Sequence, residues 1–342
     1  MKIVAEDGVK MREDNEEKIL VRGPNWVGDA VMSLPALQEL AERDGRGKVD
    51  VVCRGSVASV YRRSPSVRRV WELPGKTYIY PKEVRERGYT ALVVLPKSWR
   101  TAIQAWLSGI PRRYGLGTRW RSFLFTDPTP MRGADRQIHH GRLFYRAAGG
   151  LIEEPEELPA PQMTAEQEKG EEIVGAGNYM AIHPGAAYGP AKRWPPAKFG
   201  RFLNELVKRH ELPVVALGVE AERRLADEIF ELAGKSVKSV NLAGETSLDE
   251  CMDVLAGAAL VVANDSGLMH LAAGLGTPTV GIFGSSSPQL TSPLGKHTAV
   301  VYAGVECSPC FERECPLEEK RYRCLEEIEV ADVLTASEKV WQ

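Results

Sequence analysis

The sequence predicts an α/β protein made of two Rossmann-like, doubly wound halves. Short apolar runs of strand length alternate with segments of helical spacing, which indicates parallel sheets covered by helices. This rhythm stops once, in the Pro- and Glu-rich stretch 151–164 (LIEEPEELPAPQMT), and then restarts. A length of 342 residues also suits two domains of ordinary size better than one. We therefore expect domains at 1–165 and 166–342.

The expected elements follow the alternation of apolar runs. In the first half, strands are expected at 18–21, 49–53, 70–73 and 91–95, and a helix at 30–43. In the second half, strands are expected at 179–183, 213–217, 240–242 and 260–263, and helices at 196–208, 221–233 and 248–256. A further strand–helix–strand unit occupies 261–288, and a C-terminal helix is expected after the Cys-rich segment 307–324.

Composition and charge narrow the class of protein. The chain is 43% hydrophobic and 26% charged, and no apolar run reaches the roughly 20 residues that span a bilayer. The acidic N-terminus lacks the apolar core of a signal peptide, so we expect a cytoplasmic protein. Residues 51–150 hold 19 Lys+Arg and 5 Asp+Glu, a balance of +14, so the rest of this −2 chain carries −16. The asymmetry favours an anionic partner: nucleic acid, a membrane surface or a phosphorylated substrate.

The segment VVANDSGLMHLAAGLGTPTVGIFGSSSP (261–288) carries the strongest local signal. Asn264, Asp265 and Ser266 lie where a strand passes into a helix that begins near Gly267. Ligands bind at this place in α/β sheets, and the N–H groups and positive dipole end of the helix suit a phosphate. A well-capped helix in an ordinary βαβ unit explains the same pattern, so both interpretations stay open.

Two loops carry candidate catalytic groups. The loop GPNWVGD (23–29) lacks GxGxxG, and Asp29 stands where a P-loop requires lysine. An acid at the start of a helix is placed to act as a general base or as a cap. In HPGAAYGPAKRWP (183–195), Lys192 and Arg193 either reach a diphosphate or form a basic pair on a surface loop.

Four cysteines lie close together in a loop-rich segment. Cys307, Cys310, Cys315 and Cys324 form C-x2-C-x4-C-x8-C. In a cytoplasmic protein such a cluster favours a metal over disulfides, so structural Zn²⁺ or an Fe–S cluster is one hypothesis. Free or redox-sensitive thiols are the other, because the spacing is not that of a standard zinc finger. The remaining two, Cys53 and Cys251, are expected in the core.

Four segments together resemble a known family. GPNWVGDAVMSLPAL, HPGAAYGPAKRWP, LAGETSLDE and NDSGLMHLAAGLGTPTVGIFGSSSP, in this order, are similar to the ADP-heptose:lipopolysaccharide heptosyltransferases of glycosyltransferase family 9, the heptosyltransferase II type in particular. The resemblance runs from about Lys18 to the C-terminus and leaves the first 17 residues without a role. It implies a GT-B fold, in which the first domain mainly holds the acceptor and the second holds the sugar nucleotide. It also implies inverting transfer of heptose from ADP-L-glycero-β-D-manno-heptose to the heptosylated Kdo-lipid A inner core of lipopolysaccharide.

The resemblance assigns roles by position. Asp29 falls on the aspartate that takes the acceptor proton, and Lys192 on the lysine that stabilises the departing diphosphate. The implied donor site is Asn264, Asp265, Ser266, Gly267, His270 and Glu222, and the implied acceptor site is Asn25, Trp26, Arg54, Arg119 and Arg121. Glu220 is an alternative to Glu222 for the ribose. The Asp265 carboxylate is expected to face the heptose hydroxyls or to cap the helix.

The remaining expectations concern partners and alternatives. The chain has no Asp-x-Asp, so no cofactor is expected to be required for catalysis. The implied partners are ADP-heptose, the Kdo-lipid A acceptor and the inner face of the inner membrane, and no nucleic acid. A basic, aromatic cluster is expected to meet the lipid surface: Arg112, Arg113, Arg119, Arg121 and Trp120. Trp99 and Trp106 are expected in the core or in helix packing. Open alternatives are transfer of the first heptose to Kdo2-lipid A, a non-catalytic lipopolysaccharide-docking module, and a nucleotide-dependent dehydrogenase or epimerase, which the missing GxGxxG disfavours.

Overall fold

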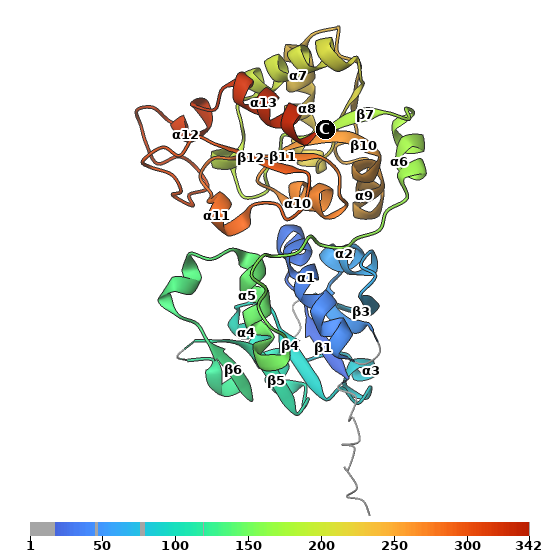
Figure 1. Ribbon diagram of the computed structural model, residues 1–342, viewed down its shortest axis with the longest axis vertical. Coiled ribbons are helices and arrows are strands. Elements are labelled where there is room, and N and C mark those ends of the chain that lie inside the picture. Colours follow the sequence, from blue (N-terminus) through green and yellow to red (C-terminus); the bar gives the residue numbers. More distant parts are fainter. Residues whose placement is uncertain (1–17, 45–46, 76–78, 119, 342) are drawn as a thin grey trace, which may run out of the picture.

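The computed structural model describes residues 18–44, 47–75, 79–118 and 120–341 and places them in two α/β domains (Figure 1). Each domain has a six-stranded parallel sheet, in the orders β3-β2-β1-β4-β5-β6 and β12-β11-β10-β7-β8-β9. In both sheets the chain moves outward from the first strand and then returns to its other side, which creates the switch point of a doubly wound sheet. The prediction of two Rossmann-like halves is confirmed.

The elements follow in chain order. The first domain contains β1 (Ile19–Arg22), α1 (Val27–Arg43), β2 (Val49–Arg54), α2 (Ala58–Arg62), β3 (Val67–Leu73), α3 (Lys82–Arg85), β4 (Ala91–Val94), α4 (Trp99–Leu107), β5 (Arg112–Gly117), β6 (Asp127–Pro130) and α5 (His140–Ala147). The second contains α6 (Gln167–Val174), β7 (Tyr179–His183), α7 (Pro196–His210), β8 (Val214–Ala216), α8 (Arg223–Ala233), β9 (Ser239–Asn241), α9 (Leu248–Gly257), β10 (Ala258–Asn264), α10 (Gly267–Gly274), β11 (Thr279–Phe283), α11 (Pro288–Thr291), β12 (Thr298–Tyr302), α12 (Arg323–Glu326) and α13 (Val330–Val340). Residues 152–166, which connect the two, contain neither helix nor strand.

The sequence pattern does not predict β5, β6 or β12, which lie at a sheet edge or, for β5, next to one. The edge strand β6 has the sequence DPTP and is largely exposed, and β12 forms the edge of the second sheet. An edge strand needs no continuous apolar run and tolerates proline, so it leaves little signal. One helix boundary matters for function: α1 begins at Val27 instead of residue 30, and this places Asp29 within its first turn.

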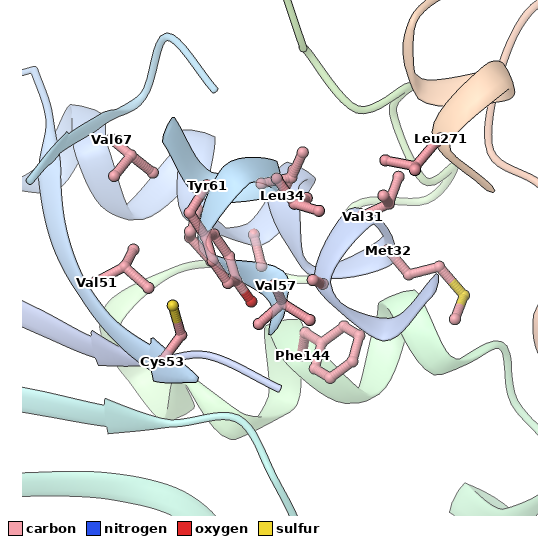
Figure 2. Packing of buried hydrophobic residues seen from close by; sticks show 14 of the residues in the cluster. Val31, Met32, Leu34, Val51, Cys53, Val57, Tyr61, Val67, Phe144 and Leu271 are labelled. Carbon is pink, nitrogen blue, oxygen red and sulfur yellow. The ribbon is translucent and has the colours of Figure 1, made fainter. Parts of the chain in front are cut away.

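An apolar core continues from the first domain into the second. Val31 of α1 and Leu271 of α10 belong to one buried cluster, which also includes Tyr61 and Phe144 (Figure 2). A Cβ on Gly274 would lie only 3.0 Å from Cγ1 of Val31, so the two helices approach closely here. Burial of apolar side chains across the boundary therefore fixes α1 against α10.

Polar contacts add to this interdomain packing. Arg63, just after α2, pairs with Asp249 at 3.2 Å and with the fully buried Asp253 at 3.0 Å, both on α9. The hydroxyl of Ser59 donates to the same Asp249 carboxylate at 2.5 Å. The buried pair of Arg63 with Asp253 holds a specific geometry, because separating it would leave a buried charge without its partner. Among the described residues, no helix has the length and apolar character needed to cross a bilayer.

Candidate active site

The first turns of α1 and α10 meet at the domain boundary. A Cβ on Gly28 would lie 2.7 Å from Cδ2 of His270, and a Cβ on Gly267 would lie 2.9 Å from Cβ of Val27. Glycine at both positions allows this approach, since any side chain would push the helices apart. Each helix start presents unpaired N–H groups and the positive end of its dipole. Two electropositive helix ends, one from each domain, thus lie side by side.

Asp29 faces an accessible pocket from the first turn of α1. The pocket has a volume of 230 Å³, and its walls include Asn25, Trp26, Lys97 and His140. Nδ1 of His140 lies 3.5 Å from Oδ1 of Asp29, and both side chains are about one-third exposed. Partial burial lowers the pKa of Lys97, while the negative charge of Asp29 acts in the opposite direction. A carboxylate that is reachable from solvent and flanked by basic groups has the placement of a general base.

Asp265 and Ser266 divide their roles at the start of α10. The hydroxyl of Ser266 caps the helix by accepting from the N–H of Met269 at 3.4 Å. The buried Asp265 carboxylate instead accepts from Nζ of Lys192 at 2.5 Å. Of the two alternatives expected for the Asp265 carboxylate, capping of α10 is therefore wrong, because the extended backbone at Ser266 turns its own hydroxyl over the first turn. The other alternative, contact with the heptose hydroxyls, stays a prediction.

The loop that carries Lys192 is braced by the Cys-rich segment. The N–H of Ala191 donates to the carbonyl of Arg313 at 3.1 Å, and the Tyr188 hydroxyl donates to the carbonyl of Phe311 at 2.5 Å. The Tyr188 ring lies 5.1 Å from Nζ of Lys192 and 5.4 Å from Cζ of Arg313, so it contacts two cations. The sequence pattern does not single out Tyr188 and Arg313, since more than 100 residues of chain separate them.

Asn264 holds the same loop from the sheet side. It ends β10, is fully buried, and accepts through Oδ1 from the N–H of Trp194 at 3.1 Å. Its Nδ2 donates to the carbonyl of Pro184 at 2.6 Å. Because these bonds engage both ends of the amide, the side chain of Asn264 positions the 183–195 loop, which carries Lys192.

Glu222 and Glu220 have different environments. Glu222 is buried, and a Cβ on Gly185 or on Gly218 would lie 2.0 Å or 2.7 Å from its carboxylate oxygens. Its Oε2 also accepts from the N–H of Val219 at 3.1 Å. Glu220 is exposed and lies 3.5 Å from Arg223. Of the two, Glu222 is the glutamate that faces the loops after β7 and β8, where α/β sheets bind ligands.

His270 is a neutral imidazole between the two helix starts. It is buried, and burial lowers its pKa to about 4, although the charges of Asp265 and Asp29 partly oppose this shift. Within the described residues its Nδ1 has no hydrogen-bond partner. The imidazole is therefore available to exchange a hydrogen bond with a bound molecule.

Residues 80–321 match the model of glycosyltransferase family 9 (heptosyltransferase). The match spans more than half of the chain. The chain belongs to glycosyltransferase family 9. The prediction of a glycosyltransferase is confirmed, and a dehydrogenase, an epimerase or a non-catalytic module no longer fits.

Two curated relatives and one solved structure agree with the family. The chain is 30% identical over 305 residues to lipooligosaccharide heptosyltransferase 2 of Haemophilus influenzae, covering 83% of this chain and 88% of the relative. It is 30% identical over 310 residues to lipopolysaccharide heptosyltransferase 2 of Escherichia coli K12, covering 83% and 87%. The solved structure of E. coli ADP-heptose lps heptosyltransferase II superposes with a TM-score of 0.79 at 26% identity, covering 95% of this chain and 98% of that one. The predicted GT-B fold is confirmed.

Three of the five predicted acceptor residues of this family 9 enzyme line two adjoining pockets. Asn25 and Trp26 border the 230 Å³ pocket that Asp29 faces, and Asn25 also borders a second pocket of 400 Å³. Arg54 lines this second pocket together with Arg22 and Arg100. Arg22 is almost completely buried, which lowers its pKa, and its Nη2 donates to Oδ1 of Asn25 at 2.9 Å. The second pocket is therefore suited to an anionic group.

Arg121 is not at the surface. Its side chain is 1% exposed, its Nη2 donates to the carbonyl of Pro96 at 3.1 Å, and its Cζ lies 5.1 Å from the ring centre of Phe125. Burial lowers its pKa to about 10. The expectation that Arg121 meets a lipid surface is wrong, because the chain turns its side chain inward after an exposed tryptophan. Arg119, also predicted at the acceptor site, lies outside the described residues.

The four clustered cysteines line one small pocket of 90 Å³. Burial raises the pKa of Cys324 to about 11, and the other three thiols add to this shift. Cys307 is exposed, while Cys310 and Cys315 are half-buried. Among the described residues, no three His, Cys, Asp or Glu side chains are grouped so as to hold a metal ion. The hypothesis of Zn²⁺ or an Fe–S cluster therefore has no support from this arrangement. The prediction that Cys53 and Cys251 lie in the core is confirmed.

Proposed function

We propose that this glycosyltransferase moves heptose from ADP-L-glycero-β-D-manno-heptose to the heptosylated Kdo-lipid A inner core of lipopolysaccharide. The support is twofold: both curated relatives named above are heptosyltransferases 2, and the solved structure is of an ADP-heptose heptosyltransferase II. The observation that carries the proposal is the meeting of α1 and α10. At this meeting point the charges of Asp29 from one domain, and of Asp265 and Lys192 from the other, all act on the same imidazole, that of His270.

The chemical step is a single displacement with inversion. The acceptor hydroxyl oxygen attacks the anomeric carbon, its proton passes to the Asp29 carboxylate, and the bond from that carbon to the diphosphate oxygen breaks. The electron pair of this bond leaves with ADP. Asp29 suits the role of base because it borders the pocket of the first domain, where the acceptor is proposed to bind.

The departing diphosphate is proposed to bind at the start of α10. The N–H groups near Ser266 and Gly267 would donate hydrogen bonds to its oxygens, and Lys192 would neutralise the charge that develops as the bond breaks. In the structure the Lys192 ammonium pairs with Asp265. We propose that it shifts toward the diphosphate when the donor binds, and that Asp265 then faces the heptose hydroxyls.

The other predicted residues complete the two halves of the cleft. Glu222 is proposed to hold the ribose of ADP, and His270 to contact the donor through its unpartnered nitrogen. Asn25, Trp26 and Arg54 are proposed to hold the acceptor, whose anionic groups suit the arginine-lined pocket. No metal is proposed to take part in catalysis, since a lysine and a helix start already face the diphosphate position. The enzyme is proposed to work in the cytoplasm, at the inner face of the inner membrane.

The first test is transfer from ADP-L-glycero-β-D-manno-heptose, in EDTA, to Kdo2-lipid A and to the same acceptor carrying one heptose. Transfer only to the heptosylated acceptor is expected. Transfer to the bare acceptor would identify the enzyme as the first heptosyltransferase, and transfer to neither by folded protein would overturn the substrate assignment.

Asp29→Asn tests the base directly. The variant should lose about 10²- to 10⁴-fold in kcat while its melting temperature stays near that of the wild type. Glu42→Gln is the matched control, because Glu42 is an exposed carboxylate farther along the same helix. Full activity in Asp29→Asn would contradict the proposed mechanism.

A further inference from the structure

An unusual set of large apolar side chains lies on the surface of the first domain. We call it the aromatic patch: Trp99, Trp106 and Leu107 of α4, and Trp120 and Phe123 in the turn before β6, each between 41% and 74% exposed. The rings of Trp99 and Phe123 lie 6.4 Å apart, which joins the helix and the turn in one surface. Large apolar side chains that are exposed together on neighbouring segments mark an interaction site in a folded protein.

The helix α4 exposes its large apolar side chains and buries small or polar ones, the opposite of an ordinary amphipathic helix in a globular protein. Its buried side carries small or polar residues, including Ala102 and Ala105, which are fully buried against the sheet. Its two tryptophans are seven positions apart, so Trp99 and Trp106 lie on one face, two turns from each other, and both are exposed. The prediction that they serve in packing is therefore wrong. A helix that buries alanine and exposes tryptophan is suited to an apolar phase outside the protein.

The charged residues near the aromatic patch indicate what kind of partner it would bind. Residues 97–126 contain six Lys+Arg and no Asp or Glu; of the six, Arg121 is buried and Arg119 lies outside the described residues. Lys97, just before α4, and Arg112, the first residue of β5, are both exposed. Exposed tryptophan and phenylalanine in a stretch of sequence that carries cations and no acids match the headgroup level of a bilayer with anionic lipids.

The patch adjoins the acceptor pockets. Ser98, the N-cap of α4, lines both the 230 Å³ pocket of Asp29 and the 400 Å³ arginine-lined pocket. Trp99 and Arg100, the next two residues, also line the arginine-lined pocket. An acceptor whose lipid end stays in a bilayer would therefore find the pocket directly beside the surface that meets that bilayer.

We propose that the aromatic patch docks this enzyme on an anionic membrane surface and presents the acceptor pocket to a lipid-anchored sugar. This inference rests on the proposed function for the nature of the acceptor, but membrane binding itself can be measured without any substrate. The aromatic rings would lie among the headgroups, and the cations beside them would pair with lipid phosphates.

The test is flotation of the full chain with vesicles of phosphatidylcholine alone or with added phosphatidylglycerol. The wild type should float with the anionic vesicles and release them as salt is raised. The triple variant Trp106→Ser, Trp120→Ser, Phe123→Ser should bind them roughly tenfold less tightly or worse, equivalent to about 1.4 kcal/mol. Leu232→Ser is the matched control, since Leu232 is half exposed on α8 of the other domain. Melting curves check that each variant folds.

Three results would overturn the proposal. The first is equal vesicle binding by the wild type and the triple variant, and the second is no vesicle binding by the wild type. The third is a wild-type dimer that the triple variant loses, which would identify the patch as a self-association surface. Transfer separates this proposal from the proposed function: the triple variant should keep its rate with a delipidated, water-soluble acceptor and lose rate with an acceptor embedded in vesicles. If the wild type fails to modify the soluble acceptor, the substrate assignment is wrong. Flotation still tests separately whether the aromatic patch binds membranes.

Discussion

Replacing Lys192 by methionine tests how the ion pair with Asp265 divides between stability and catalysis. Methionine keeps much of the apolar length of lysine and removes its charge. Loss of one preorganised charge donor at a developing anion costs about 2.7–4 kcal/mol in the transition state, so kcat should fall about 10²- to 10³-fold.

The same variant should also be less stable. Lys192 lies 2.5 Å from an Asp265 carboxylate that is 6% exposed, so its removal leaves a buried charge without its partner. Because the lysine side chain is 18% exposed, we take the low end of the range for such pairs, about 3 kcal/mol. For a domain of this size that corresponds to a melting temperature lower by about 6–12 °C.

A second substitution separates the two effects. In Lys192→Met with Asp265→Asn no unpaired carboxylate remains, so most of the melting temperature should return while the transfer rate stays low. Lys208→Met, on the exposed surface of α7, controls for the loss of a charge. The reasoning is refuted if Lys192→Met keeps a wild-type initial rate with saturating donor, or if the double variant recovers the rate together with the stability.

Three further predictions concern packing, protonation and thiol reactivity. The pKa of His270 in the folded protein is about 4, below its ordinary 6.5, so the unfolded chain binds more protons than the folded one between these pH values. The free energy of unfolding should therefore fall as the pH drops from 6.5 to 4. In denaturant titrations, His270→Asn should make this dependence on pH weaker. Gly28→Ala places a Cβ 2.7 Å from His270 and should cost about 1–3 kcal/mol of stability as well as activity. In the control Gly133→Ala the added Cβ has no neighbouring atom of the described residues within 4 Å, so this variant should melt like the wild type. At about pH 8, iodoacetamide should modify the exposed Cys307 quickly and Cys324, with its pKa of about 11, slowly, as followed by mass spectrometry. If all four clustered thiols are instead protected until a chelator is added, a metal is bound to them.

The sequence supports the prediction of the fold because parallel strands buried on both faces are continuous apolar runs. The runs at β1, β2, β4, β7 and β10 are of this kind, and each is found within a residue or two of its predicted place. The sequence pattern does not reveal β6 or β12, since a strand at a sheet edge needs neither burial nor regular alternation.

The candidate site divides in a similar way. The positions of Asp29 and Ser266 at helix starts can be predicted, because helix starts depend on local sequence. The direction in which a side chain points cannot be predicted in this way. Trp120 and Arg121 are neighbours in one basic, aromatic stretch, yet one is exposed and the other is buried on Phe125, because the local turn decides which of them faces the core.

The sequence by itself therefore determined the two doubly wound halves, the helix starts that carry Asp29 and Ser266, and the family to which the motifs belong. These depend on short-range patterns: apolar runs, caps and turns of a few residues. Only the tertiary structure decided that Asp265 pairs with Lys192, that Tyr188 and Arg313 brace the lysine loop, and that α4 turns its tryptophans outward. Each of these depends on segments that are distant in the chain and meet only when the sheets, the helices and the two domains pack together.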